Sequence, residues 1–246
     1  MQLATQIGSP VAMSPLLFQA VKFALAVAEL SEGAFDPTVG GTLEARGFNR
    51  HYLTGEVVST DLPDLGRPSY RDVQLDAQQR TVTLRRPLIL DLGAVVKGLA
   101  IDLAARELAP LQNFSIDAGG DLYVAGRNDA GEPWRVGIRH PRIPTAVAAV
   151  LRLMDVAVCT SGDYERPAPS GGHHIIDPHS GRSPDDLASV TVVAPNAMLA
   201  DSLSTAAFVL GPSRGLLLLE SQGLDGLFLS ASLERHMTPG MTAYLA

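Results

Sequence analysis

Cysteine is almost absent from this chain of 246 residues, because Cys159 is the only one. A single cysteine excludes an intrachain disulfide and a metal cluster built from several thiolates. Positive charge is also scarce, with 19 Lys and Arg against 26 Asp and Glu and a formal net charge of −7. Binding to a nucleic-acid backbone draws most of its free energy from clustered basic side chains, and the sequence has no basic stripe. We therefore expect no nucleic-acid partner.

Long uninterrupted hydrophobic runs are missing as well. The most nearly apolar stretch, 16–30, contains Gln19, Lys22 and Glu29, which is typical of an amphipathic helix and not of a membrane span. Residues 1–14 lack a basic segment followed by an apolar core, so we expect no signal peptide in this chain. As it stands, the sequence predicts a soluble, cytoplasmic protein.

What the chain does contain is enough apolar material for one sizeable core, since 46% of its residues are hydrophobic. We expect a single domain over 1–246. Periodicity predicts helices at 15–31, 95–108, 196–210 and 213–222. It predicts strands at 73–75, 81–84, 88–92, 114–118, 122–125, 134–139, two within 145–160, 174–176, 189–194 and 226–229, with 81–84 pairing with 88–92. Because strands outnumber helices and often follow one another, the predicted class is α+β with a mixed or antiparallel sheet.

An acidic residue interrupts an apolar helical stripe near the C-terminal end. Met198, Asp201, Thr205 and Phe208 are spaced so that they share one helical face. A carboxylate in such a stripe is costly unless it is paired or binds a cation. A carboxylate and a hydroxyl one turn apart suit a hard cation such as Mg²⁺. The alternative is a buried Asp that accepts hydrogen bonds from a neighbouring loop.

Residues 88–98 read as a strand, a tight turn and the start of a helix. Helix N-termini bind anions, and Lys97 would add a point charge beside a phosphate. The segment is neither a Walker A loop nor GxGxxG, so Lys97 could equally be a solvated surface residue. Further along the same helix, Asp102 and Arg106 are four residues apart, and we expect them to form a surface ion pair.

Histidines gather at 173–179, beside Asp177. His173 and His174 would point to opposite faces of a strand, so a shared zinc ion is disfavoured. One imidazole acting as a general base or contacting a substrate is more economical, and ordinary loop-edge histidines are the alternative. Glycine turns at 117–121 and 161–164 would either bring backbone amides close to a ligand or be plain turns.

The order of these motifs along the chain identifies a resemblance that none of them carries alone. From about residue 11 to near the C-terminus, the sequence closely resembles the ApbE-type flavin transferases. The resemblance lies in six ordered motifs: 33–40 (GAFDPTVG), 91–98 (DLGAVVKG), 119–121 (GGD), 160–164 (TSGDY), 174–178 (HIIDP) and 197–206 (AMLADSLSTA).

The resemblance implies an activity and a set of site residues. Enzymes of this family use FAD as substrate, need Mg²⁺, attach FMN through a phosphoester to a Thr or Ser of an acceptor protein, and release AMP. By motif, Asp201 and Thr205 would supply side-chain oxygens to Mg²⁺, together with a backbone carbonyl near Ala94, and His174 would deprotonate the acceptor hydroxyl. The residues implied to line the FAD site are Phe35, Asp36, Pro37, Thr38, Lys97, Gly119, Gly120, Asp121, Asp163, Tyr164 and Asp177.

The sequence also departs from the family pattern. Members normally begin with further strands and a helix ahead of the position that matches Val11, so we expect the chain to be incomplete at its N-terminus. A pocket lacking one wall motivates a second hypothesis, a non-catalytic flavin-binding protein. A third is an FAD pyrophosphatase that gives FMN and AMP, as some members do. Many relatives are exported, often as lipoproteins, which leaves the compartment open.

Overall fold

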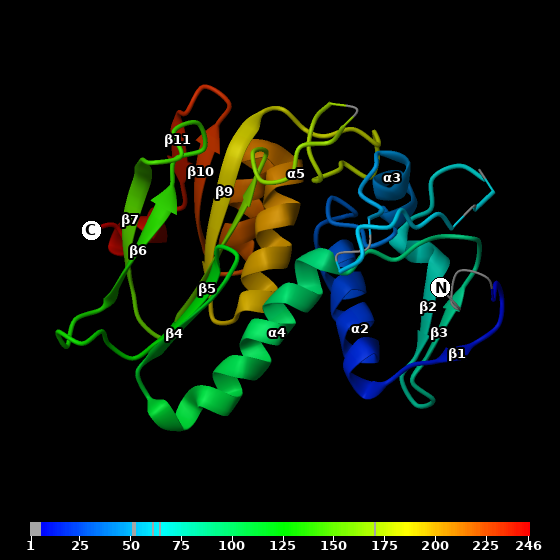
Figure 1. Ribbon diagram of the computed structural model, residues 1–246, viewed down its shortest axis with the longest axis horizontal. Helices are drawn as coiled ribbons and strands as arrows, with labels where there is room; N and C mark the ends of the chain where they lie inside the picture. The colour runs from blue at the N-terminus through cyan, green and yellow to red at the C-terminus, as the bar shows by residue number, and fades with distance from the viewer. Residues whose placement is uncertain (1–5, 51–52, 61, 64, 170) are drawn as a thin grey trace. The chain divides into compact units, whose positions relative to one another are not determined.

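The computed structural model describes residues 6–50, 53–60, 62–63, 65–169 and 171–246. Its internal contacts divide the chain into two compact units. The first comprises 1–92 and 166–183, and the second comprises 93–165 and 184–246. Figure 1 shows the elements of each unit in the order of the chain.

The first unit is built on helix α2, which packs on a small antiparallel sheet in the strand order β1-β3-β2. Ser14 caps α2 by accepting a hydrogen bond from the Leu17 amide at 3.3 Å, as its position before Pro15 predicts. Phe18 and Val21 of the helix lie against Val82 of the sheet. The elements are β1 (Val11–Ala12), α2 (Pro15–Leu30), α3 (Gly40–Ala45), η1 (Tyr70–Asp72), β2 (Val73–Asp76) and β3 (Thr81–Leu84).

The predicted pairing of 81–84 with 88–92 is wrong. Strand β3 pairs with β2 on one side and β1 on the other, so both of its edges are taken. The β2–β3 turn is fixed by Asp76, whose carboxylate accepts the amides of Gln78 and Gln79. Residues 88–92 form no strand and make one isolated parallel bridge, Val39 to Ile89.

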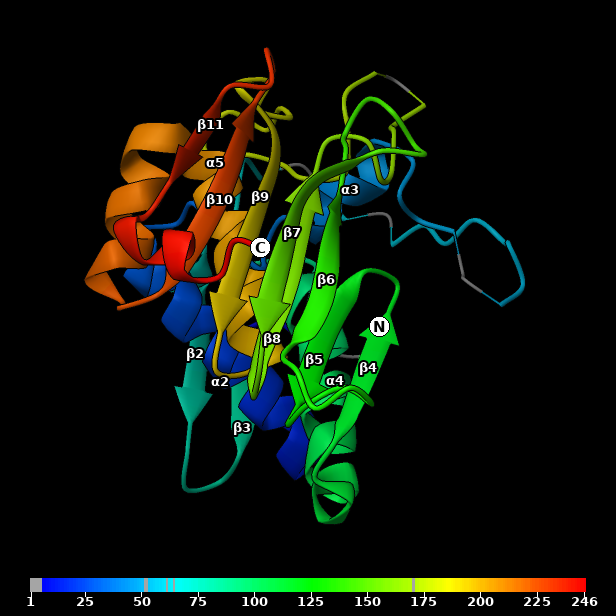
Figure 2. The same ribbon diagram turned by 90° about the vertical axis from the view of Figure 1, so that its left-hand side faces the viewer.

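The second unit contains a six-stranded antiparallel sheet in the order β11-β10-β9-β8-β5-β4, seen face-on in Figure 2. The hairpin β6–β7 covers one face, and between them lies a core that includes Leu151, Val158 and Val193. Helices α4 and α5 cover the other face. The elements are α4 (Gly93–Leu108), η2 (Ala109–Leu111), β4 (Phe114–Ala118), β5 (Asp121–Ala125), β6 (Trp134–Arg139), β7 (Val147–Leu153), β8 (Val156–Gly162), β9 (Leu187–Ala194), α5 (Ala197–Ser221), β10 (Asp225–Ser230), β11 (Arg235–Met237) and η3 (Pro239–Ala243).

Alternation along the strands decides which side chains meet the helices. In β8, Val158 faces the β6–β7 core, so Cys159 and Ser161, one and three residues later, face α5. The same rule places Asp121 of β5 on the helical face, opposite to its neighbour Leu122, which packs on the core. The side chains of Cys159, Ser161 and Asp121 therefore lie on the face of the sheet that α4 and α5 cover.

Helix α5 corresponds to the two helices predicted at 196–210 and 213–222. They run on without a loop, and the junction is Gly211, with φ 73°, followed by Pro212. By length and composition α5 is the one helix in the described part of the chain that could cross a membrane, yet half of that window is buried inside the protein. It packs on β8 and β9, as a core helix does.

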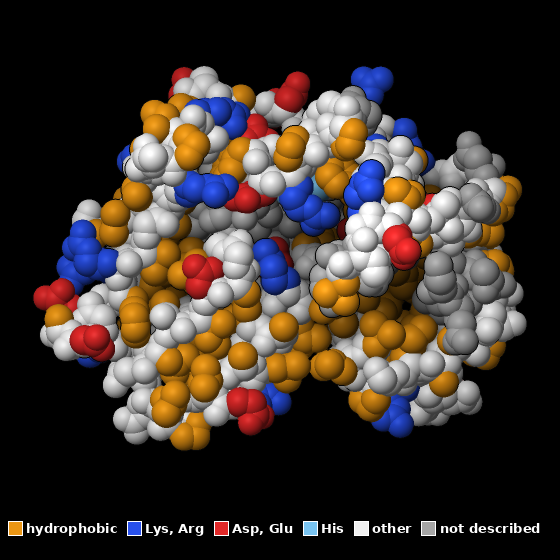
Figure 3. All heavy atoms as spheres, in the orientation of Figure 1, with side chains coloured by type: hydrophobic (Ala, Val, Ile, Leu, Met, Phe, Trp, Pro, Cys, Tyr) orange, Lys and Arg blue, Asp and Glu red, His pale blue; other side chains and the backbone are white. Residues whose placement is uncertain are grey.

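The α+β class with antiparallel pairing is confirmed. The strand predicted at 174–176 is absent from the described structure, where the nearby pairing is an isolated bridge between Pro167 and His173. The single domain over 1–246 stays a prediction. Figure 3 shows basic and acidic side chains interspersed with hydrophobic ones over the face drawn.

Candidate functional site

Asp201 lies one turn into α5, past the N-cap residue Asn196. Its side chain is buried, with the residue 7% exposed, and among the described residues its Oδ2 has no hydrogen-bond partner. The hydroxyl of Thr205, one turn further, donates to the Asp201 carbonyl at 3.2 Å and lies 3.1 Å from the Ser161 hydroxyl. The predicted shared face of Asp201 and Thr205 is confirmed, and capping of the helix does not account for the carboxylate.

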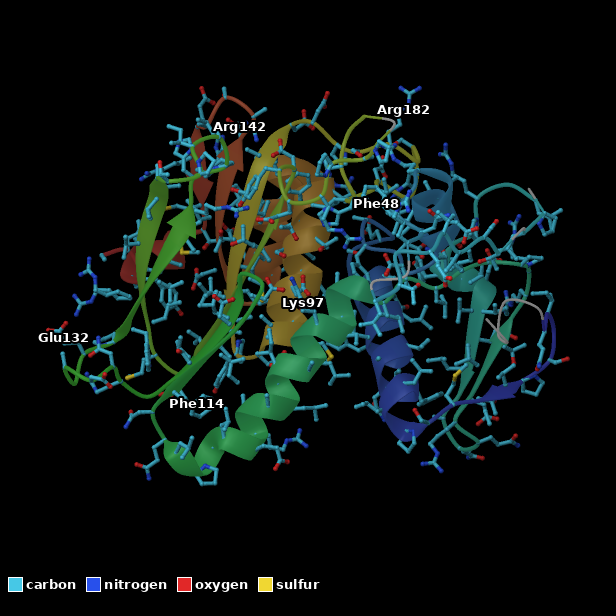
Figure 4. The ribbon with its side chains drawn as sticks, viewed as in Figure 1. Phe48, Lys97, Phe114, Glu132, Arg142 and Arg182 are labelled. Atoms are coloured by element: carbon cyan, nitrogen blue, oxygen red, sulfur yellow. The ribbon has the colours of Figure 1, made fainter. Side chains whose placement is uncertain are left out.

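Lys97 faces this carboxylate from α4. Its ammonium forms an ion pair with Asp121, which is 1% exposed at the start of β5, and Figure 4 shows Lys97 on α4 close to α5. Burial tends to lower the pKa of Lys97, but the nearby carboxylates of Asp201 and Asp121 prevail and raise it. Lys97 is thus a cation beside two carboxylates, and its side chain is 44% exposed to solvent.

The same three charges set the electrostatics of Asp201. Burial raises the pKa of its carboxyl well above the ordinary value, and the neighbouring Asp121 raises it further, while Lys97 acts in the opposite direction. When both carboxyl groups are ionised, one ammonium against two buried carboxylates leaves an excess of negative charge. A site of this kind gains from a second cation.

The oxygens present suit a hard cation. The carboxylate of Asp201 and the hydroxyl of Thr205 would hold it, and Ala94 is the second residue of α4, in the same unit. No group of three or more His, Cys, Asp or Glu side chains in the described residues is arranged to hold a metal. A cation here would therefore rely on hydroxyl, carbonyl, water or phosphate oxygens for the remainder, as Mg²⁺ commonly does.

The glycine turn beside Asp121 has a backbone conformation that favours glycine. Gly119 and Gly120 connect β4 to β5 with φ of 67° and 93°, the pattern of a two-residue hairpin turn of type I′. The carboxylate of Asp117 accepts the Gly120 amide at 2.8 Å. A Cβ on either glycine would meet no atom within 4 Å, so the turn is open on the outside.

Asp163 and Tyr164, at the end of β8, have arginine partners that the sequence did not indicate. Both oxygens of the Asp163 carboxylate accept from Arg142, each at 2.7 Å. The guanidinium of Arg139 lies over the Tyr164 ring, 4.8 Å from its centre. Arg142 is labelled in Figure 4. A ligand contact by the Asp163 carboxylate would have to share it with Arg142.

In the first unit, the loop Phe35-Asp36-Pro37-Thr38 is held rigid by Asp36. One carboxylate oxygen accepts from both the amide and the hydroxyl of Thr38, at 2.9 and 2.7 Å, and the other accepts the Tyr70 amide at 2.8 Å. Burial raises the pKa of Asp36, against the lowering effect of these hydrogen bonds. Asp36 therefore shapes the loop through its own backbone contacts.

His174 lies in the same unit, beside an aromatic ring. The rings of Phe48 and His174 meet edge to face with centroids 6.4 Å apart, and the guanidinium of Arg166 lies over Phe48, 5.6 Å from its centre. Phe48 is labelled in Figure 4. The backbone of His174 is also fixed, because its amide donates to the Arg166 carbonyl at 3.1 Å. These contacts define the surroundings of His174, and its role as a base stays a prediction.

Asp177 closes the turn that follows His174. Its carboxylate accepts the amides of His179 and Ser180 at 2.9 and 3.3 Å. Burial tends to raise the pKa of Asp177, but hydrogen bonds from Ser180 and His179 outweigh it and lower the pKa. Like Asp36, Asp177 therefore uses its carboxylate oxygens to accept hydrogen bonds within its own loop.

Sequence reasoning missed several members of these clusters. The sequence indicates Ser161 only as part of a glycine turn. Phe48, Arg142 and Arg166 carry no local signal, since their partners lie far along the chain. The expectation of a surface pair between Asp102 and Arg106 is wrong. The Asp102 carboxylate instead accepts the amides of Ala197 and Met198 at the start of α5.

Known proteins share both the sequence and the fold. A protein from Haemophilus influenzae named FAD:protein FMN transferase is 32% identical over 89% of this chain and 67% of its own length. The crystal structure of an ApbE protein from Thermotoga maritima has a TM-score of 0.88 and 31% identity, covering 100% of this chain and 82% of that one. The structure titled flavin transferase ApbE from Vibrio cholerae has a TM-score of 0.83 and 28% identity, covering 98% and 81%. Because the sequence model of the ApbE family matches residues 1–228, the chain belongs to the ApbE family.

Proposed function

We propose that this chain transfers FMN from FAD to a Thr or Ser hydroxyl of an acceptor protein and releases AMP, in a reaction that needs Mg²⁺. Membership of the ApbE family and relatives named FAD:protein FMN transferase support the flavin chemistry. The identity of the acceptor hydroxyl, the release of AMP and the metal requirement are the parts that this proposal adds.

The observation that carries the metal requirement is the buried carboxylate of Asp201. Its unpartnered Oδ2, the Thr205 hydroxyl one turn away and the excess negative charge beside Lys97 are what a Mg²⁺ site for a pyrophosphate substrate needs. When bound there, the ion would neutralise charge on the pyrophosphate of FAD.

The bond changes are those of a phosphoryl transfer. The acceptor oxygen attacks the phosphorus on the FMN side, and a new P–O bond forms as the bond from that phosphorus to the bridging oxygen breaks. The bridging oxygen leaves with AMP, and the hydroxyl proton passes to a base. Such a displacement needs charge neutralisation and a positioned nucleophile more than it needs covalent catalysis.

The chain's residues take separate roles in this scheme. Lys97 adds a fixed positive charge in the unit that holds Asp201, beside where the phosphates would lie. His174 is the proposed base, with its ring oriented by Phe48. The loop at Phe35 to Thr38 and the turn at Gly119-Gly120 are proposed to line the flavin nucleotide through backbone groups. Both carboxylate oxygens of Asp36 already accept hydrogen bonds from the protein, and the glycine turn is open on its outer side.

The direct test is AMP release from FAD by the purified chain, with Mg²⁺ or with EDTA, alongside a peptide that contains one Thr. We expect AMP only with Mg²⁺, and one FMN mass added to the peptide for each AMP released. A matched peptide with Val in place of Thr should stay unlabelled.

The other outcomes assign the alternatives. AMP at the same rate with and without the Thr peptide, with no mass added, would indicate a pyrophosphatase in which water replaces the acceptor. Tight FAD binding without AMP would indicate a flavin-binding protein. Equal turnover in EDTA would remove the metal from the scheme.

A further inference from the structure

Asp102 joins the two helices that carry the candidate metal site. Its carboxylate, midway along α4, accepts the Ala197 amide at 2.7 Å with one oxygen and the Met198 amide at 3.0 Å with the other. These amides belong to the first two residues of α5 and have no acceptor within their own helix. A carboxylate that accepts two such amides with both oxygens also complements the positive end of the helix dipole.

A close backbone contact lies beside this link. A Cβ added to Gly98 of α4 would come within 2.5 Å of the Met198 backbone, closer than real atoms approach. Gly98 and Asp102 are one turn apart on the same helix and both meet the first turn of α5. The two helices are therefore locked in direction and in distance at this point.

Ordinary helix capping does not require this arrangement. Asn196 already caps α5, because its side chain accepts the Leu199 amide at 2.9 Å. Asp102 adds a link from a different helix, across 95 residues of sequence. Its effect is to fix where the α5 backbone begins relative to α4.

Residues that bear on the candidate metal site lie within a turn or two of this link. Asp201 is four residues beyond Ala197, and Thr205 is four further on. On α4, Lys97 lies five residues before Asp102, a rise of roughly 7.5 Å along the helix. A slip or rotation of the α5 start would carry over to Asp201 and Thr205 because a helix is stiff over two turns.

We propose that Asp102 is a positioning residue for the metal site: by binding the first amides of α5 from α4, it holds Asp201 and Thr205 in register with Lys97 and the start of α4. The proposal rests on the proposed function, because it concerns the geometry that would bind Mg²⁺.

The test compares Mg²⁺ affinity and thermal stability in matched variants. Asp102→Asn keeps one acceptor oxygen and Asp102→Ala keeps none. Asn196→Ala removes the other cap of the same helix end without touching α4. Glu107→Gln removes one negative charge from an exposed position on α4. Mg²⁺ binding is measured by titration calorimetry on folded protein, and the midpoint of thermal unfolding is measured in EDTA.

We expect Mg²⁺ affinity to fall in the order Asp, Asn, Ala at position 102, with a loss of roughly 10-fold or more for Asp102→Ala. Asn196→Ala should lower the unfolding midpoint by a similar amount yet leave the affinity within about 3-fold, because it leaves the α4 link intact. Glu107→Gln should change neither quantity appreciably.

Three results would overturn the proposal. Equal losses of affinity in Asp102→Ala and Asn196→Ala at equal loss of stability would make Asp102 an ordinary cap. Unchanged affinity in both Asp102 variants, with the parent binding Mg²⁺, would refute the positioning role and leave the proposed function standing. A parent chain that binds no Mg²⁺ and releases no AMP from FAD would refute both together.

Discussion

A buried carboxylate oxygen without a hydrogen-bond partner costs folding free energy, and Oδ2 of Asp201 is such an oxygen even with Lys97 nearby. The pKa of Asp201 is raised in the folded chain, chiefly by burial. At pH values between its pKa in the unfolded chain and its pKa in the folded chain, the folded chain therefore binds more protons. Stability in EDTA should therefore fall as pH rises through the folded pKa. Asp201→Asn should flatten this dependence and gain about 1–3 kcal/mol at neutral pH. Urea unfolding at mildly acidic and neutral pH measures both, and a steeper loss in the variant would contradict the sign.

The same substitution should abolish function while it stabilises the fold. Without the anionic oxygen, Mg²⁺-dependent AMP release should fall by about 100-fold or more, equivalent to about 2.7 kcal/mol. Asp155→Asn is the matched control, because it removes a carboxylate of the same unit that lies outside the candidate metal site and accepts the Gly126 amide at 2.7 Å. That variant should keep the parent rate. Parent-like turnover in Asp201→Asn would remove this residue from the metal site.

Cys159 offers a residue-scale test of packing under α5. The thiol is fully buried and lies 3.6 Å from the Ala197 carbonyl. Burial raises its pKa well above the ordinary value, and the nearby carboxylates of Asp121 and Asp201 raise it further. Few thiolates form in the folded protein, so a thiol reagent should react only as fast as the chain opens. One thiol per chain should appear after denaturation, and rapid labelling in native buffer would show that the sheet–helix face is not closed.

At the scale of elements, the β4–β5 turn allows backbone conformation to be separated from ligand contact. Gly120 and Gly131 both have positive φ, of 93° and 74°, and a Cβ on either meets no atom within 4 Å. Alanine at each should therefore cost a similar 1 kcal/mol or so of folding free energy. If the turn lies against FAD as proposed, Gly120→Ala should also raise the KM for FAD several-fold, whereas Gly131→Ala should not.

The control decides how that result is interpreted. Equal KM values in the two variants at equal stability would mean that Gly119-Gly120 is a plain hairpin turn. The unfolding midpoint of each variant must be measured with the kinetics, since a loss of folded protein lowers the apparent rate without changing KM.

The sequence predicted those elements whose signal is local. The alternation in 134–139 and the apolar period around Asp201 follow from which face is buried, and both are confirmed by β6 and α5. The failures are matters of long-range pairing. Residues 88–92 have a strand composition, but β3 already has partners on both edges, and the bridge of Ile89 with Val39 is set by chain segments 50 residues apart.

The candidate site divides in the same way. Spacing along one helix was enough to single out Asp201 and Thr205. The ion pair of Lys97 with Asp121 and the link from Asp102 to α5 join different elements, and no pattern in either segment states the partner. The spacing on α4 favours Arg106 as the partner of Asp102, but two helix amides without acceptors in their own helix are better partners for a carboxylate than an exposed arginine.

At the scale of the whole molecule, each of the two units is assembled from two separated segments of the chain. The first is assembled from 1–92 and 166–183, so the chain leaves it and returns, crossing from one unit to the other at three points. His174 and Asp177 belong to the returning segment, and neither segment alone contains the first unit's complete set of contacts. The two segments of a unit are joined through the other unit. When that other unit unfolds, the ends of the two segments are no longer held close together.

We therefore expect one cooperative thermal transition, as the single-domain prediction requires, with equal calorimetric and van't Hoff enthalpies. FAD together with Mg²⁺ should raise this one midpoint, by about 2.7 kcal/mol of added stability at a ligand concentration 100 times the dissociation constant. Differential scanning calorimetry on the parent and on Asp201→Asn tests both statements. Two resolved transitions, with the ligands shifting one of them, would show that the units fold independently and would refute the single domain. A Mg²⁺-dependent shift of the midpoint that is retained in Asp201→Asn would place the metal elsewhere.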